Sequence, residues 1–156
     1  MEDKKVYLTK EGLEKIKKEY QELQKIRESK TKEGVPSFSS EEVNPEYLVF
    51  QEDLKFLEDR ITEIKQTLKS AQLIKAPTKD KQNIINLGAR VLVETNGGQS
   101  DEFEIVGSLE ANPSLGKISD ESPVGKALLG HKIGEKVIVQ SAIKAAYKIR
   151  KIKYDF

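Results

Sequence analysis

Three glutamates in one short segment could do chemistry together. The stretch SSEEVNPEY, residues 39–47, carries Glu41, Glu42 and Glu46, and no Lys or Arg occurs anywhere within residues 33–54. Carboxylate oxygens are ligands that Mg²⁺ accepts together with water, and an uncompensated negative field favours a cation. The alternative interpretation is that Glu41 and Glu42 only place favourable negative charge before the N-terminus of the helix that follows.

An amphipathic helix is expected on each side of this segment. The first has Thr9 as its N-cap, and its apolar stripe consists of Leu13, Ile16, Tyr20 and Leu23. The second has Asn44 as N-cap and Pro45 in its first turn, and its stripe consists of Tyr47, Phe50, Leu54, Leu57, Ile61, Ile64, Leu68 and Ala71. A helix over residues 45–72 would be about 40 Å long. The stripes predict an antiparallel coiled-coil hairpin over residues 1–75, with its tip at about residues 34–46.

The hydrophobic period changes after the helices. Residues 76–88 are interpreted as a linker, and residues 89–156 as a compact domain. Strands are expected over Arg90–Asn96 and Glu102–Glu110 and in the segments KVIVQSA and AAYKIRKIKY. Ser122 and Pro123 are the expected N-cap and first residue of a short helix that ends at Gly130. The predicted fold class is therefore α+β, a helical hairpin followed by a domain with an antiparallel sheet and one short helix.

Composition limits the classes of function. The formal net charge of +1 argues against a protein that coats nucleic acid by bulk electrostatics. The absence of cysteine excludes disulfides and thiolate metal sites. No signal peptide and no apolar run of about 18 residues is found. We expect a soluble, cytoplasmic protein with no membrane partner.

Five segments in order carry a resemblance to a known family. They are LTKEGLEKI, NPEY, RITEIKQTLKSAQLI, IVGSLEANPSLGKIS and SPVGKALLGHKIGEKVIV. With these segments the chain resembles the bacterial Gre transcript-cleavage factors, and within them the GreA branch, along essentially its whole length. The resemblance implies a coiled-coil hairpin followed by an FKBP-like domain.

The resemblance also implies a mechanism and partners. The C-terminal domain would dock at the rim of the secondary channel of the RNA polymerase core, as a monomer. The hairpin would reach the nascent RNA 3′ end in backtracked complexes. There the tip would help the polymerase hold a second Mg²⁺, and the polymerase itself would cut the RNA, so the protein would be no independent enzyme. The isolated protein would bind no cofactor.

The tip departs from the family pattern. Gre factors usually carry GDLSENAEY, in which the Asp and the first Glu are the catalytic pair. Aligned through NPEY, this chain has Ser40 and Val43 at those positions. Residues 12–44 are also about one helical turn shorter than in the family.

Three interpretations stay open. Glu41 and Glu42 could supply the catalytic, metal-binding carboxylates from new positions, although adjacent side chains converge only in a tight turn. The protein could instead enter the channel without cleavage and compete with true cleavage factors. The two acids could also serve only the helix N-terminus.

Further residues receive roles from the resemblance. Asn44, Glu46 and Tyr47 would support the tip. A basic cluster would contact the RNA phosphates, and the alternative is that the cluster is only a solvated helix face. The cluster consists of Lys25, Arg27, Lys30 and Lys32. Polymerase-binding residues would be Asp120, Ser122 and Pro123, although the last two are also explained as a helix start.

Two other classes of protein were weighed. A prolyl isomerase would need an aromatic-lined pocket, and the second half offers only Phe103, Tyr147, Tyr154 and Phe156. A pure coiled-coil scaffold would leave the second half unexplained. The lone His131, in an expected loop, is interpreted as a surface residue.

Overall fold

The computed structural model describes residues 5–34, 45–140 and 145–155, and these form two compact units. One unit contains residues 13–71 and is called the hairpin unit. The other contains residues 5–12 and 72–156 and is called the sheet unit. This division differs from the expected boundaries, because residues 5–12 and the expected linker both belong to the sheet unit. None of the described helices is long and apolar enough to cross a membrane.

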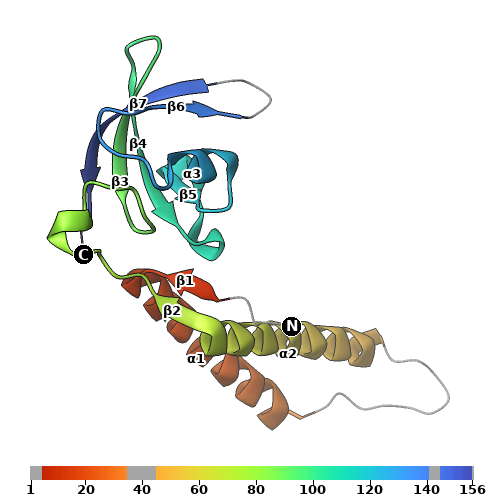
Figure 1. Ribbon diagram of the computed structural model, residues 1–156. Helices are drawn as coiled ribbons and strands as arrows, with labels where there is room; N and C mark the ends of the chain where they lie inside the picture. The colour runs from red at the N-terminus through yellow and green to blue at the C-terminus, as the bar shows by residue number, and fades with distance from the viewer. Residues whose placement is uncertain (1–4, 35–44, 141–144, 156) are drawn as a thin grey trace. The chain divides into compact units, whose positions relative to one another are not determined.

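The hairpin unit consists of two antiparallel helices, α1 (Lys10–Lys32) and α2 (Pro45–Ser70) (Figure 1). Two contacts across the hairpin show that the helices are antiparallel. In the first, Arg60 donates to both carboxylate oxygens of Glu19 at 2.9 and 3.2 Å. Toward the other end of the hairpin, Lys30 Nζ lies 3.5 Å from Asp53 Oδ2. The expected hairpin is confirmed.

The predicted stripes are the covered faces of these helices. Leu57, Ile61 and Ile64 of α2 are buried, and the stripe of α1 is half-buried. Burying one such aliphatic side chain contributes roughly 1.5–3 kcal/mol to stability.

The sheet unit contains a five-stranded sheet in the order β5-β4-β3-β7-β6 (Figure 1). Its strands are β3 (Arg90–Thr95), β4 (Ser100–Val106), β5 (Lys117–Ser119), β6 (Lys136–Val139) and β7 (Ala145–Lys153). Neighbouring strands are antiparallel except β5, which runs parallel to β4. The four expected strands thus form the expected antiparallel pairs, and the parallel edge strand β5 is an additional strand that was not expected. The helix α3 (Pro123–Leu128) packs against the sheet, and the α+β class is confirmed.

The core of the sheet unit lies on one face of the sheet. It consists of Ile85, Ala89, Val91, Val93, Ile105, Leu128, Val137 and Ile149. Ile85 is fully buried although it lies in the expected linker. That linker also contains the 3₁₀ helix η1 (Lys79–Lys81). Residues 76–88 are thus part of the packed domain.

The predicted strand over Glu102–Glu110 is too long. It ends at Val106 and is followed by the 3₁₀ helices η2 (Ser108–Glu110) and η3 (Pro113–Leu115). At Gly107 a Cβ atom would lie 2.2 Å from the carbonyl oxygen of Tyr7. The chain therefore leaves the sheet at Gly107, where it passes close to the backbone of Tyr7.

That neighbour is a strand which the sequence analysis missed. β1 (Val6–Leu8) forms a two-stranded sheet with β2 (Ala71–Leu73), and the Ile74 amide donates to the Leu8 carbonyl at 2.8 Å. Thr9 is the N-cap of α1, as expected, because its hydroxyl accepts from the Gly12 amide at 3.1 Å. Glu110 binds the same Thr9 from η2.

Candidate functional site

The acidic segment joins the two helices of the hairpin. α1 ends at Lys32 and α2 begins at Pro45, so Glu41 and Glu42 belong to the connection between them. These two glutamates and Asn44 lie outside the described residues. Their assignment as catalytic, metal-binding and tip-supporting residues stays a prediction.

The first turn of α2 carries the other residues expected to support the tip. Glu46 is exposed there, and the positive end of the helix dipole stabilises the negative charge of its carboxylate. Tyr47 is half-buried on the stripe, and its hydroxyl accepts from Gln51 Nε2 at 2.9 Å. Tyr47 therefore belongs to the packed face of the hairpin, next to the acidic segment.

The negative field of the acidic stretch is partly compensated, contrary to the expectation. Lys30 lies across the hairpin from it, 3.5 Å from Asp53 and 5.9 Å from the centre of the Phe50 ring. Lys30 lies outside residues 33–54 in the sequence, and the antiparallel fold brings it from α1 to the acidic stretch. Glu33 and Glu52 remain exposed.

The basic cluster does not form one patch. At 3.6 residues per turn, Lys25 and Lys32 share one face of α1, whereas Arg27 and Lys30 lie on another. Lys30 is engaged with α2, and Lys32 pairs with Glu28 at 3.5 Å. Arg27 borders a hollow of about 610 Å³ lined by Gln24, Arg27, Glu28, Thr31 and Glu58. RNA contact by the cluster stays a prediction, with Lys25 and Arg27 exposed.

A hydrogen-bond network surrounds the start of α3. Ser122 caps the helix by accepting from the Gly125 amide at 3.1 Å, and it donates to the Ser119 carbonyl at 2.7 Å. The hydroxyls of Ser108 and Ser119 lie 2.8 Å apart, and Ser108 donates to Glu121 at 3.1 Å. The sequence analysis identified the cap and missed Ser108, Ser119 and Glu121.

This network fixes the surface that carries the predicted polymerase-binding residues. The Asp120 amide donates to the Val106 carbonyl at 2.9 Å, and Pro123 is exposed. At Gly125 a Cβ atom would lie 2.1 Å from the Ser119 carbonyl oxygen, so the loop and the helix touch. The structure thus brings Asp120, Ser122 and Pro123 together on one rigid turn.

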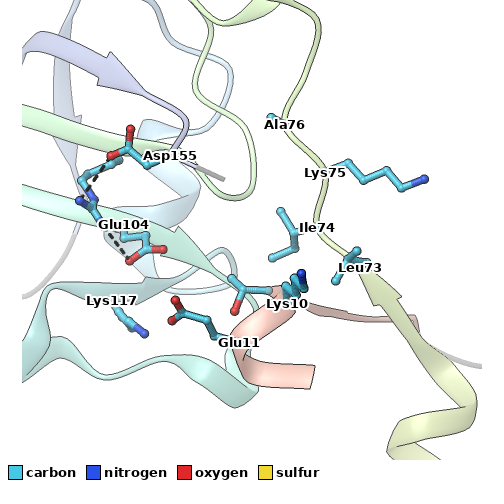
Figure 2. Close-up of a pocket in the computed structure, with 11 residues that line it drawn as sticks. Lys10, Glu11, Leu73, Ile74, Lys75, Ala76, Glu104, Lys117 and Asp155 are labelled. Atoms are coloured by element: carbon cyan, nitrogen blue, oxygen red, sulfur yellow. Dashed lines mark ion pairs between the residues drawn. The ribbon is translucent and has the colours of Figure 1, made fainter. Parts of the chain in front are cut away.

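A further cavity, of about 580 Å³, lies in the sheet unit (Figure 2). Arg90 stands in it, paired with Asp155 at 3.4 Å and with Glu104 at 4.0 Å. Leu73 and Ile74 supply apolar lining. The sequence analysis did not predict this cavity. The Arg90 guanidinium also pairs with Glu102 at 3.5 Å, so three carboxylates already surround it.

The remaining expectations concern metals and aromatic pockets. Within the described ranges no group of three or more His, Asp or Glu side chains could hold a metal ion. Phe103 and Tyr147 pack edge to face, 5.8 Å between centres, against the core. The Tyr154 hydroxyl accepts from the Asn86 amide at 2.8 Å. Phe103, Tyr147 and Tyr154 therefore pack against the core of the sheet unit.

Family models match both units of the chain. One described as "Transcription elongation factor, GreA/GreB, C-term" matches residues 79–154. Another, described as "Transcription elongation factor, N-terminal", matches residues 6–73. Together they account for nearly the whole sequence.

Relatives of similar length agree with these matches. The chain is 37% identical to "Transcription elongation factor GreA" of Thermomicrobium roseum, over 90% of this chain and 92% of the relative. It is 36% identical to the protein of that name from Syntrophomonas wolfei, over 97% and 98%. A solved structure, the GreA factor homolog 1 of Thermus thermophilus, is 26% identical over 96% of this chain and 99% of the other, with a TM-score of 0.43.

Proposed function

The chain belongs to the GreA/GreB family of transcription elongation factors, and from this premise we propose that it binds RNA polymerase through the secondary channel and stimulates cleavage of backtracked RNA. The nuclease activity would be that of the polymerase, and the protein would be no independent enzyme. The partners would be the bacterial polymerase core and the nascent RNA 3′ end. The active form would be a cytoplasmic monomer.

One observation carries this proposal. The segment with Glu41 and Glu42 is the connection between two antiparallel helices, of which the first ends at Lys32 and the second begins at Pro45. A helix of 26 residues such as α2 is about 39 Å long. A thin element of this length can deliver carboxylates through a channel that excludes a globular domain.

The chemistry of the tip follows from its residue types. Carboxylates and water are the ligands that Mg²⁺ prefers, and phosphodiester hydrolysis in two-metal sites uses such ions to stabilise the attacking and leaving oxygens. Glu41 and Glu42 would supply oxygen ligands to an ion held jointly with the polymerase. The isolated protein would need no bound cofactor.

The sheet unit would supply the docking surface. Asp120, Ser122 and Pro123 lie on a turn held by the Ser122 cap and by close packing at Gly125. A recognition surface whose backbone is held in this way loses little conformational freedom when it binds. This rigidity supports the assignment of the turn to the channel rim.

A second candidate function rests on the composition of the tip. Ser40 and Val43 stand where the family pattern has its two catalytic acids. If Glu41 and Glu42 do not replace those acids, the protein would occupy the channel without cleavage and compete with active cleavage factors.

One assay separates the two candidates. Stalled, backtracked complexes of the cognate polymerase are incubated with the protein and Mg²⁺, and short 3′ RNA products are measured. We expect cleavage by the wild type, a large loss in Glu41→Ala and in Glu42→Ala, and full activity in the control Glu52→Ala, which removes an exposed carboxylate from α2. Undiminished cleavage by both tip variants would refute the assigned roles. An inactive wild type that blocks an active Gre factor would establish the second candidate.

A further inference from the structure

The face of the sheet opposite the core carries a row of lysines on β6 and β7. On the core face, Val91, Val93, Val137 and Ile149 are buried. The opposite face is called the outer face here. Its lysine row consists of Lys136, Lys148, Lys151 and Lys153, all exposed.

A β-bulge in β7 gathers this row. Val93 pairs with Ile149, but the next partner, Leu92, pairs with Lys151, so Arg150 is an extra residue in β7. In a regular strand Lys148 and Lys151 would point to opposite faces, because side chains alternate. The bulge restores Ile152 to the packed side and places Lys151 beside Lys148 on the outer face.

The row brings like charges together. Lys136 of β6 is the direct cross-strand partner of Lys148 of β7, and like charges in such a position are destabilising. Contact with Lys153 lowers the pKa of Lys151 below its ordinary value. Within the described part of the chain, none of these four lysines forms an ion pair. Asp155 and Glu102 attract Lys151 from a distance, but neither forms an ion pair with it. A cluster of like charges that costs stability and lacks ion pairs of its own points to an anionic ligand.

The acids of the outer face are already occupied by arginines. Arg150 donates to Glu94, the neighbour of Lys148 on β3. Arg90 pairs with the remaining outer-face carboxylates, which are Glu102, Glu104 and Asp155. These carboxylates thus form their ion pairs with arginines and not with the lysines of the row.

Protection of a sheet edge does not explain the row. Lysines often stand on edge strands, where they discourage pairing with other chains. That reason applies to Lys136 on β6, which is an edge strand. It does not apply to β7, which lies between β3 and β6 and carries the other three lysines.

We propose that this lysine row is a binding surface for the phosphate backbone of a single nucleic-acid strand. The row is about one strand wide and its cations are spaced along β7, which suits a linear polyanion. The aromatic side chains of the described sheet pack in the core, where Phe103, Tyr147 and Tyr154 are found. Without a stacking platform on the outer face, binding reads phosphates and not bases.

Binding is measured by fluorescence anisotropy with the full-length protein and a labelled single-stranded oligonucleotide of about 12 nucleotides, within known strand-binding site sizes. The test variant is Lys148→Gln/Lys151→Gln. The control is Lys79→Gln/Lys81→Gln, which removes the same charge from exposed positions of η1. We expect binding of the test variant to weaken about tenfold at low salt, and its log–log salt slope to fall by about 1.4, because each neutralised phosphate contributes about 0.7.

Two further measurements make the test decisive. Lys136→Glu should raise the melting temperature, since it turns the repulsive pair with Lys148 into an attractive one, and should weaken oligonucleotide binding. Equal binding by test and control variants overturns the proposal. It is also overturned if the row binds a labelled poly-glutamate peptide but no oligonucleotide, because the ligand would then be an acidic protein. Neither result depends on cleavage activity, so the proposed function is tested separately.

Discussion

Glu110 accepts two hydrogen bonds from Thr9, which lies 101 residues earlier in the chain. The Thr9 amide donates to one carboxylate oxygen at 2.7 Å, and the Thr9 hydroxyl donates to the other. The same hydroxyl accepts from the Gly12 amide and so caps α1. The start of α1 is thus fastened to the sheet unit, to which residues 5–12 belong.

The first prediction concerns this carboxylate. Glu110→Gln replaces an acceptor of two bonds with a group that offers one carbonyl oxygen, so we expect a loss of about 1–3 kcal/mol. Hydrogen exchange at the Thr9 and Gly12 amides should become faster. The matched control Asp101→Asn removes an exposed carboxylate of β4 and should leave these amides unchanged. Unaltered protection of Thr9 in Glu110→Gln would contradict the assigned role.

The second prediction concerns Gly12 in the first turn of α1. In an exposed helix, Gly→Ala ordinarily stabilises by about 1 kcal/mol. Here the new Cβ would lie 2.2 Å from Glu110 Oε1, so the carboxylate must move and release Thr9. We expect Gly12→Ala to destabilise the protein in urea unfolding. In Gly12→Ala/Glu110→Ala the clash is absent, so the two changes should cost less together than the sum of each alone. Additive losses would show that the two residues do not interact.

These contacts mark where sequence reasoning fails. The helices, the Thr9 cap and the start of α3 at Ser122 were predictable, because spacing and caps are local signals. Three other features depend on partners that are distant in the chain. They are the hydrogen bonds between Thr9 and Glu110, the parallel strand β5 and the bulge at Arg150. One signal was available: a glycine three residues after an N-cap is a poor helix former and indicates a close approach.

The candidate site was predictable to a similar extent. The turn proposed to bind polymerase was chosen through Ser122 and Pro123, which the structure shows as the start of α3. The division of the basic cluster follows from the helical repeat, which places Lys25 and Lys32 on one face of α1 and Arg27 and Lys30 on another. The pairing of Lys30 with Asp53 needed the antiparallel register of the hairpin. The geometry of Glu41 and Glu42 lies outside the described residues.

The third prediction concerns Tyr154 at the end of β7. Its hydroxyl donates to the Ile84 carbonyl and accepts from the Asn86 amide, and so holds the segment before β3. Tyr154→Phe should cost about 1 kcal/mol. Burial raises the pKa of Tyr154, so the wild type should also lose stability as the pH rises above about 10, where tyrosine ionises in the unfolded chain. The slope of stability against pH should be smaller in the variant; an identical slope would contradict this.

The fourth prediction concerns Glu135, whose carboxylate lies 2.6 Å from His131 Nδ1. The hydrogen bond with His131 lowers the pKa of Glu135 below its ordinary value. A depressed folded pKa means that this stabilisation is present above the unfolded pKa and is lost as the pH falls through the folded one. Carboxyl NMR titration should show Glu135 protonating below the ordinary pH range of a glutamate side chain. His131→Ala should raise the pKa of Glu135 toward its ordinary value, and a titration unmoved by that change would exclude the contact.

The last prediction separates two possible tasks of the basic residues on α1. Lys30 pairs with Asp53 and lies over Phe50, so it also stabilises the hairpin. Lys25 is exposed and makes no such contact with the residues that the structure describes. An exposed ion pair and a cation–π contact of this kind each contribute about 0.5 kcal/mol. Lys30→Gln should therefore lower the unfolding free energy of the hairpin by up to about 1 kcal/mol, and Lys25→Gln should leave it unchanged. If both residues also contact RNA, both variants should reduce cleavage of backtracked complexes, and Lys25→Gln should do so without any change in stability. Full cleavage activity of Lys25→Gln would show that Lys25 does not contact RNA. Lys30 would then keep only its structural role.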